Sequence, residues 1–271
     1  MQRPGRALSR MRAATPLVQN ITNFVAMNTV ANALLAIGAS PAMVHAREEA
    51  AEFAAIADAL SINIGTLSAD WIESMAEAAA AASAAGRPWV LDPVAVGATR
   101  FRRRTGERLL ALGPTLIRGN ASEIIALGQA EGGSGRGVDA ADQVAAAEAA
   151  AVALAIRSGA VVAVTGAVDF VTDGRRAARI ANGHALMPRV TALGCALTGV
   201  AAAFLGARCE HFDGTVAALA YFGLAGEQAA YGAAGPGSFA VRFIDALAGI
   251  DPDALDAGAR IVEVDSPERS S

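Results

Sequence analysis

Short apolar runs and longer amphipathic segments alternate along most of the chain. Runs typical of buried strands occupy residues 42–46, 61–64, 89–92, 115–118 and 161–165. Segments with helical periodicity lie between them, at residues 47–60, 68–85, 100–112 and 140–157. Strands that alternate with helices are typical of a mostly parallel sheet. The pattern therefore predicts a three-layer α/β/α fold, with helices on both faces of a central sheet.

The remaining segments extend this pattern. A helix is expected from a cap at Asn23 to Gly38. Asp173-Gly174 predicts an antiparallel hairpin between the apolar residues on either side. Other expected features are a strand end at residues 187–190, helices over residues 196–249 and a strand at residues 261–264. A Gly-rich segment at residues 132–137 is expected to be a flexible loop. It is not expected to be a nucleotide fingerprint, because it lies too far from any strand end.

Nothing in the sequence divides the chain into two domains. No linker or internal repeat interrupts the alternation, so we expect one domain over residues 15–265, followed by a tail at residues 266–271. Residues 1–14 contain several arginines without an apolar segment behind them, which argues against a signal peptide. We expect this basic segment to be a frayed, solvated arm.

Composition narrows the class of protein. Apolar residues make up 54% of the chain, charged residues 18%, and the mean hydropathy is +0.38. Much of this surplus is Ala, which suggests closely packed helices and a buried subunit interface. The two long uncharged runs, residues 17–44 and 190–207, hold too many amides, or Gly and Thr, for a membrane span. The net charge of -4 predicts neither a nucleic-acid nor a membrane partner. Two cysteines form no disulfide framework, so a reducing cytoplasm is expected.

Polar residues are sparse in this chain, yet they cluster where the predicted strands end. Ligands of parallel sheets bind beyond the carboxyl ends of the strands. These positions are residues 43–45, Gly65-Thr66, Asp92-Pro93, residues 118–123, Thr165-Gly166 and the turn at Cys195. We therefore expect them to meet at one site.

The turn before the helix at residues 196–206 is a candidate anion site. A glycine turn that opens into a helix leaves backbone N–H groups unpaired, and the helix dipole adds positive charge there. Gly194 stands at the turn and Cys195 on the first helical turn, where a thiol is easier to ionise. The alternative is a buried cysteine at a well-packed helix start, which these residues alone would favour.

Two carboxylates and an arginine add the chemistry of phosphoryl transfer. Asp92 and Glu123 offer the one or two carboxylates that a hydrated Mg²⁺ takes beside phosphate oxygens. Arg118 could clamp a phosphate, and Thr165-Gly166 combines a hydroxyl with a closely approachable backbone. Each also has a structural interpretation: helix-dipole stabilisation for Glu123, a surface ion pair for Arg118, an ordinary turn for Thr165. Without a Walker-A sequence, a kinase with these residues would need another architecture.

Seven motifs follow one another in this order between about residues 15 and 248: Gln19-Asn-Ile-Thr-Asn-Phe-Val with Asn28, Ser40-Pro-Ala-Met43, Asn63-Ile-Gly65-Thr66, Leu91-Asp-Pro-Val94-Ala-Val-Gly97, Ile117-Arg-Gly-Asn-Ala-Ser-Glu123, Val164-Thr-Gly166 and Leu193-Gly-Cys195. Together they resemble the hydroxyethylthiazole kinase family of the ribokinase-like superfamily. Asn120-x-x-Glu123 also resembles the superfamily's Asn-x-x-Glu element, which organises Mg²⁺ and phosphate.

The resemblance implies ATP-dependent phosphorylation of the primary hydroxyl of 4-methyl-5-(2-hydroxyethyl)thiazole, a salvage step toward thiamine. It also implies a homotrimer with sites between neighbouring subunits. The positions that match the family's motifs are Met43, Asn23, Gly65, Ala192 and Cys195 for the thiazole; Arg118, Thr165, Asn120 and Gly166 for ATP; Asp92 and Glu123 for Mg²⁺; and Gly194 with Cys195 for the catalytic turn, where many superfamily members place an Asp base.

The chain departs from the family at one position. The family often reads Gly-Thr-Gly-Cys at the turn, whereas this chain has Ala192-Leu193-Gly194-Cys195. A Cβ disfavours the φ values open to Gly, so we expect residue 192 to lose that conformation and, with it, a backbone contact to the substrate.

Three other functions remain open on the sequence. A related small-alcohol kinase of the same fold, such as a hydroxymethylpyrimidine kinase, would share most of these motifs. A thiol hydrolase or acyltransferase using Cys195 would need a His partner, and no motif surrounds His45, His184 or His211. A non-catalytic nucleotide-binding protein would bind ATP without releasing ADP.

Overall fold

The computed structural model describes residues 1–128 and 140–264, so the Gly-rich segment at residues 132–137 and the tail at residues 266–271 lie outside the described residues. The described strands form one nine-stranded sheet in the order β2-β1-β3-β4-β5-β6-β7-β8-β9. Their bounds are β1 (Leu17–Ile21), β2 (Ser40–Ala42), β3 (Ala59–Asn63), β4 (Trp89–Asp92), β5 (Leu116–Asn120), β6 (Val161–Thr165), β7 (Asp169–Thr172), β8 (Ala177–Ile180) and β9 (Ile261–Val264). Strands β1 to β6 run parallel, and β7, β8 and β9 add an antiparallel edge.

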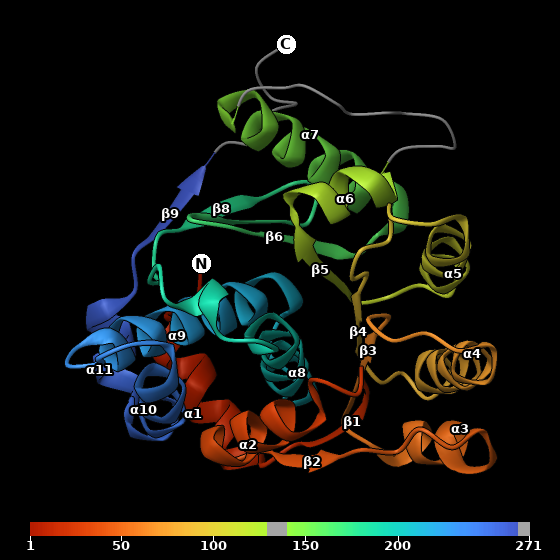
Figure 1. The fold of residues 1–271 in the computed structure, drawn as a ribbon, viewed down its shortest axis with the longest axis horizontal. Helices are drawn as coiled ribbons and strands as arrows, with labels where there is room; N and C mark the ends of the chain where they lie inside the picture. Colours follow the sequence, from red (N-terminus) through yellow and green to blue (C-terminus); the bar gives the residue numbers. More distant parts are fainter. Residues whose placement is uncertain (129–139, 265–271) are drawn as a thin grey trace.

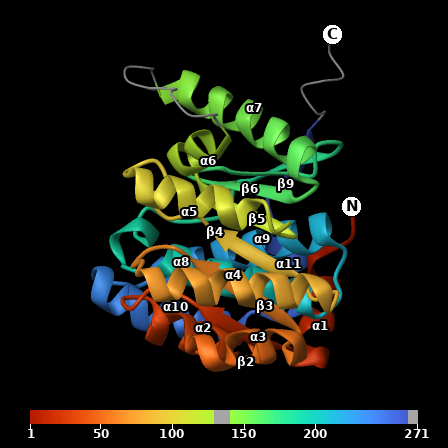
Figure 2. The same ribbon diagram turned by 90° about the vertical axis from the view of Figure 1, so that its right-hand side faces the viewer.

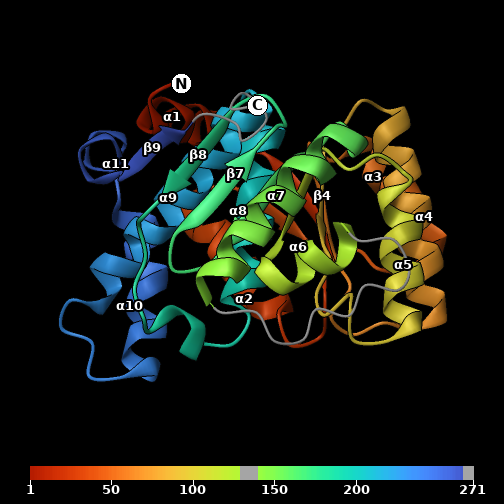
Figure 3. The ribbon, with the colours of Figure 1, turned by 90° about the horizontal axis from the view of Figure 1, so that it is seen from above.

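Helices cover both faces of this sheet, which confirms the predicted three-layer fold (Figures 1 and 2). One layer holds α1 (Pro4–Ala14), α2 (Met27–Ile37), α8 (Leu193–Gly206), α9 (His211–Ala230), α10 (Pro236–Gly249) and α11 (Pro252–Gly258). The other holds α3 (Arg47–Ile56), α4 (Ala69–Ala84), α5 (Arg100–Leu110), α6 (Ala121–Gly128) and α7 (Ala140–Ser158). Helix α7 packs on β6 and β7, and seen from above it lies beside the antiparallel β7 (Figure 3). No helix of the described residues is long and apolar enough to cross a membrane.

Alternating strand residues build two separate cores, one on each face. In β6, Val161 and Ala163 pack on the α9 side, whereas Val162 and Val164 pack on the opposite side with α7. Because successive side chains of a strand point to opposite faces, a strand buried on both faces must be apolar throughout. This requirement explains the continuous apolar runs in the sequence.

The strand order reverses beside β1, and this reversal positions the site. The crossover from β1 to β2 uses α2 on one face, and the crossover from β2 to β3 uses α3 on the other. The chain therefore leaves β1 and β3 toward opposite faces of the sheet, and doubly wound sheets bind ligands at the carboxyl edge beside such a reversal. Helix α8 packs on β1, β3 and β4, so its N-terminus faces the same edge.

Four sequence-based expectations about the elements are wrong. Strand β2 spans Ser40–Ala42, so it ends where the strand expected over residues 42–46 would begin. Residues 4–14 form helix α1 rather than a frayed arm, and Leu8 and Met11 are fully buried against the α9 side of the molecule. Residues 187–189 form a 3₁₀ turn rather than a strand end, because Pro188 has no N–H to join a ladder. The first helix after β1 begins at Met27 rather than at Asn23.

Candidate active site

Hydrogen bonds connect the ends of β1, β3 and β4 with the start of α8. The Nδ2 of Asn23 donates to the Oδ1 of Asn63 at 2.9 Å and to the Sγ of Cys195 at 3.2 Å. The Nδ2 of Asn63 in turn donates to the Oδ2 of Asp92 at 2.6 Å and to the same Sγ at 3.2 Å. Four residues far apart in the sequence therefore form one buried polar network, which requires the parallel strand ends to meet as predicted.

Asp92 is the buried charge of this network. Its side chain is fully inaccessible, and its Oδ2 also accepts from the Oγ1 of Thr198 at 2.8 Å. The Nη1 of Arg118 lies 3.7 Å from the Oδ2 of Asp92, while the Oδ1 of Asp92 has no hydrogen-bond partner among the described residues. Burial raises the pKa of Asp92 to about 6, although the positive charge of Arg118 opposes the shift. A buried, partly unpartnered carboxylate is typical of a functional group rather than a packing residue.

Cys195 is not the activated thiol that its helix position predicts. Burial raises the pKa of Cys195, and the negative charge of Asp92 raises it further. These effects outweigh the amides of Asn23 and Asn63, which favour the thiolate. The expected lowering by the helix start is therefore wrong for this chain, and the side chain is a neutral thiol near pH 7.

Arg118 links the network to the end of β6. Its Nη2 donates to the Oγ1 of Thr165 at 2.7 Å, and its Nε meets no acceptor in the part of the chain that the structure describes. A Cβ at Gly194 would come within 3.1 Å of Nη1, so the glycine lets the start of α8 approach the guanidinium closely. The positive end of a helix and an arginine side chain thus converge, which suits an anionic ligand.

Glu123 and Asn120 form a reciprocal cap at the start of α6. The Glu123 carboxylate accepts from the backbone N–H of Asn120 at 2.8 Å and of Ala95 at 2.9 Å. The Oδ1 of Asn120 accepts from the Glu123 N–H at 3.0 Å. This geometry fixes the carboxylate between the β4–α5 loop and the end of β5.

A cleft of about 620 Å³ lies beside Arg118. Its volume is within the range of small-ligand sites. Three of the expected ATP residues line it, namely Arg118, Thr165 and Gly166, together with Gly194 of the turn. The fourth, Asn120, is exposed at the end of β5 outside the lining. The remaining wall comes from the antiparallel edge and α9: Asp169, Asn182, Gly183, His184, Leu219 and Phe222 among others.

The expected thiazole residues divide into two groups. Asn23, Gly65 and Cys195 belong to the network, since the Gly65 N–H donates to the Oδ1 of Asn63 at 2.9 Å. A Cβ at Gly65 would lie 2.9 Å from both Asn23 and Asn63, so only glycine fits. Met43 is half-buried just past β2, at the same edge of the sheet because β2 pairs in parallel with β1.

The backbone conformation of Ala192 differs from the one we expected. Its φ is 67° and its ψ is 0°, so the alanine adopts the left-handed conformation that a glycine takes easily. The expectation that the Cβ excludes this conformation is wrong. The cap position retains glycine-like backbone geometry despite the substitution, at a conformational cost of about 1–2 kcal/mol.

Sequence reasoning missed Asn63, Thr198 and Asp169. Asn63 begins the motif Asn63-Ile-Gly65-Thr66 and stands at a strand end between two apolar residues. Thr198 follows Cys195 by three residues, which places both on one helical face. Asp169 lines the cleft, and burial raises its pKa to about 6. A buried polar residue in an apolar run was the available signal for the first two.

The residues present fit a hydrated divalent cation held jointly with phosphate. In the described part of the chain, no cluster of three or more metal-binding side chains forms an all-protein cage. Mg²⁺ needs no such cage, because it keeps waters and takes one or two carboxylates with phosphate oxygens. The unpartnered Oδ1 of Asp92 and the remaining lone pairs of Glu123 supply acceptors for metal ligation or for metal-bound water.

Comparison with known proteins adds sequence relatives that match nearly the whole chain. The model described as "Hydroxyethylthiazole kinase family" matches residues 8–253. A hydroxyethylthiazole kinase of Cereibacter sphaeroides (strain ATCC 17029) is 68% identical over 257 residues, which cover 95% of this chain and 97% of that one. A hydroxyethylthiazole kinase of Rhizobium johnstonii is 65% identical over 259 residues, with 95% and 97% coverage.

Solved structures agree with this result. The hydroxyethylthiazole kinase protein of Pyrococcus horikoshii OT3 superposes with a TM-score of 0.90 at 44% identity, covering 98% of this chain and 100% of that one. The pyridoxal kinase of Staphylococcus aureus in complex with AMP-PCP has a TM-score of 0.63 at 16% identity, covering 93% and 100%. The second likeness concerns the fold alone.

Proposed function

Because the chain belongs to the hydroxyethylthiazole kinase family, we propose that it transfers the γ-phosphoryl group of ATP to the primary hydroxyl of 4-methyl-5-(2-hydroxyethyl)thiazole, a salvage step toward thiamine. The observation that carries this assignment is the 68% identity over 95% of the chain to a kinase of that name. In this proposal the cleft beside Arg118 takes ATP, and the edge of the sheet around the buried network takes the thiazole.

ATP occupies the cleft of about 620 Å³ in this proposal. Arg118 binds phosphate oxygens, the Thr165 hydroxyl and the Gly166 backbone contact the nucleotide, and Asn120 supports the phosphate end through Glu123. The close approach of Gly194 to Arg118 supports this placement, because the N-terminus of α8 and the Arg118 guanidinium both direct positive charge toward the same volume. Arg118 would exchange its present contacts with Thr165 and Asp92 for charge-assisted bonds to phosphate.

Asp92 and Glu123 hold Mg²⁺ with the phosphates. The cation supplies neutralisation of the charge on the transferring phosphoryl group. Glu123 is oriented for this role by the N–H groups of Asn120 and Ala95, which hold both carboxylate oxygens. Asp92 is oriented by Asn63 and Thr198, which leave one oxygen free.

The thiazole lies against Met43 and the network of Asn23, Gly65 and Cys195, with the backbone at Ala192 closing the site. A thioether packs favourably on a heteroaromatic ring. Only the thiolate of Cys195 could accept the hydroxyl proton, becoming a thiol, and the raised pKa of Cys195 keeps this form scarce near neutral pH. Positioning and charge stabilisation therefore contribute most of the rate, and proton transfer contributes on the order of 10²-fold or less.

The test of the function is ADP release with the thiazole alcohol, with and without Mg²⁺. Turnover that needs both supports the proposal, whereas ATP binding without ADP release indicates a non-catalytic nucleotide-binding protein. A panel that includes hydroxymethylpyrimidine separates the two small-alcohol kinases. Activity toward esters without ATP would indicate a thiol hydrolase.

Arg118→Ala tests the nucleotide assignment. We expect the KM for ATP to rise at least about tenfold, since a bidentate charge-assisted contact to phosphate is lost, while the KM for the thiazole alcohol changes little. Initial-rate kinetics in both substrates give the two values. Equal increases in both KM values would contradict the assigned role.

We propose further that the active form is a homotrimer with sites between subunits. Two observations support this: the apolar surplus of the composition, and the exposure of Phe24 and Val25 beside the network residue Asn23.

A further inference from the structure

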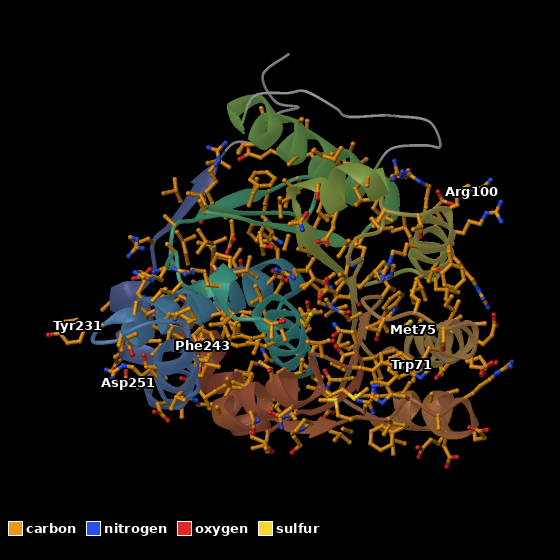
Figure 4. All side chains as sticks on the ribbon, in the orientation of Figure 1. Trp71, Met75, Arg100, Tyr231, Phe243 and Asp251 are labelled. Carbon is orange, nitrogen blue, oxygen red and sulfur yellow. The ribbon has the colours of Figure 1, made fainter. Side chains whose placement is uncertain are left out.

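Helix α5 begins with a run of arginines whose members have different environments. Arg100 and Arg104 are exposed, and Arg100 projects away from the molecule (Figure 4). Arg102 turns inward instead. Its Nη1 donates to the carbonyl oxygens of Ile64 at 2.6 Å and Val94 at 3.0 Å, and its Nη2 donates to the carbonyl oxygen of Gly65 at 2.7 Å.

These three carbonyls belong to two different loops. Ile64 and Gly65 follow β3, whereas Val94 follows β4. Arg102 forms no ion pair with any described carboxylate, so its charge acts on backbone carbonyls alone. Hydrogen bonds from an ionised donor are stronger than neutral ones, and the planar fork of a guanidinium can hold several acceptors at fixed angles.

Each loop carries a group of the proposed site. Gly65 donates to Asn63, which contacts Asp92 and Cys195. On the second loop, the Ala95 N–H donates to the Glu123 carboxylate at 2.9 Å. Ala95 has a φ of 53°, a left-handed conformation that costs a non-glycine residue about 1–2 kcal/mol and persists only when neighbouring contacts hold it. Arg102 binds the carbonyl immediately before it.

We propose that Arg102 is a positioning residue that clamps the β3–α4 and β4–α5 loops together and so couples the thiazole-binding side to the Glu123 side of the site. The clamp acts through backbone atoms and touches neither substrate. This inference rests on the proposed function, because it assigns consequences to Gly65 and Glu123.

The main test compares Arg102→Met, which keeps the length and apolar stem, with Arg104→Met on the same helix. We expect R102M to weaken binding of the thiazole alcohol, measured calorimetrically without ATP, and to raise the Mg²⁺ concentration for half-maximal activity. Loss of such supporting contacts typically costs roughly 10-fold or more. R104M should match the wild type in both. A lower Tm in R102M with both values unchanged would show a merely structural role and overturn the proposal.

Two further measurements keep the test decisive. Arg102→Lys should recover part of the loss, since one ammonium cannot reproduce the fork to three carbonyls, and it replaces R102M if that variant does not fold. Hydrogen exchange of the Gly65 and Ala95 amides should accelerate in R102M or R102K but not in R104M; unchanged exchange at both would refute the clamp.

Glu123→Gln separates failure of this inference from failure of the proposed function. If E123Q leaves the Mg²⁺ requirement unchanged, the metal assignment is wrong, whereas the amide exchange still reports on the clamp. If E123Q raises the requirement and R102M or R102K does not, the clamp alone is wrong.

Discussion

Two residues at the carboxyl edge of the sheet adopt states that are unfavourable for stability. Asp92 is a carboxylate without solvent contact, and Ala192 is an alanine in a left-handed conformation. Neither arrangement favours stability by itself. Both are maintained by neighbours that hold them for binding and chemistry, as expected where strain and desolvation coincide with function.

The conformation of Ala192 makes Ala192→Gly a stabilising substitution. Glycine removes the left-handed cost of about 1–2 kcal/mol, but it adds about 0.4–1 kcal/mol of chain entropy to the unfolded state. We expect a net gain of about 0.5 kcal/mol and a Tm higher by about 1–2 °C, measured calorimetrically. The control is Ala80→Gly in the middle of α4, exposed and helical, which should lose about 1 kcal/mol. Destabilisation by both glycines would contradict this account.

The raised pKa of Asp92 predicts how stability depends on pH. Between its ordinary pKa of 3.8 and about 6, the folded protein without ligands binds more protons at this site than the unfolded chain. The contribution of Asp92 to stability is therefore full below pH 4 and is lost as the pH rises through about 6. Asp92→Asn removes this titration, so the free energies of unfolding of D92N and the wild type should diverge over that window by roughly 2–3 kcal/mol in favour of D92N.

Urea unfolding of both proteins at intervals from pH 4 to 7.5 measures this divergence. Asp169 also has a pKa raised to about 6, but it titrates in both proteins and cancels in the difference. A difference in unfolding free energy that stays constant over the range would contradict the assigned burial effect.

The residues of the site could be predicted where they stand at the end of a predicted strand. Asp92, Arg118 and Thr165 each follow an apolar run, and the parallel order of the strands brings them together. Asn63 and Thr198 stand out in the sequence only as polar residues in apolar runs, and their roles could not be assigned because these depend on which atoms they meet across the sheet. The direction of the Cys195 pKa was wrong for the same reason: helix position is visible in the sequence, whereas burial beside Asp92 is not.

At the scale of elements, most strands and long helices were predictable, whereas the short strand β2 and the N-terminal helix α1 were not. Strands β4 and β6 have the predicted bounds because burial on both faces demands continuous apolar runs. Helix α1 was missed because its arginines dominate the composition, while its apolar stripe contains only Ala7, Leu8 and Met11. Pro4 at the first helical turn was the overlooked signal.

The burial of α1 predicts the effect of Leu8→Ala. Leu8 is fully buried where α1 packs on α9, and the helix is also tied down by the Gly5 N–H, which donates to Asp256 at 2.7 Å. Truncation should destabilise the protein by about 2–4 kcal/mol, measured by urea unfolding. The matched control is Leu35→Ala, at a leucine that is 61% exposed, which should stay within about 0.5 kcal/mol of wild type. A frayed arm would leave both variants unchanged.

Exposed apolar side chains lie at the carboxyl edge of the sheet, next to the proposed site. Phe24 is 67% and Val25 62% exposed immediately after β1, and the Phe24 ring lies 4.6 Å from that of Trp71, measured between centroids. The Phe24 N–H donates to the hydroxyl of Thr66, so this apolar residue is anchored beside the thiazole side of the site. Contact with a second subunit at this position would cover the patch and complete the pocket at once.

Phe24→Ser tests this arrangement at the level of the assembly. Light scattering of the wild type should give three times the chain mass of 27.3 kDa, and the variant should dissociate on dilution with a parallel loss of specific activity. Removal of an aromatic anchor from an interface typically costs more than 1 kcal/mol per copy. Tyr231→Ser is the control, because Tyr231 is 85% exposed and projects from the opposite side of the molecule from Trp71 (Figure 4). A single-chain mass with full activity at every dilution would show that each subunit holds a complete site.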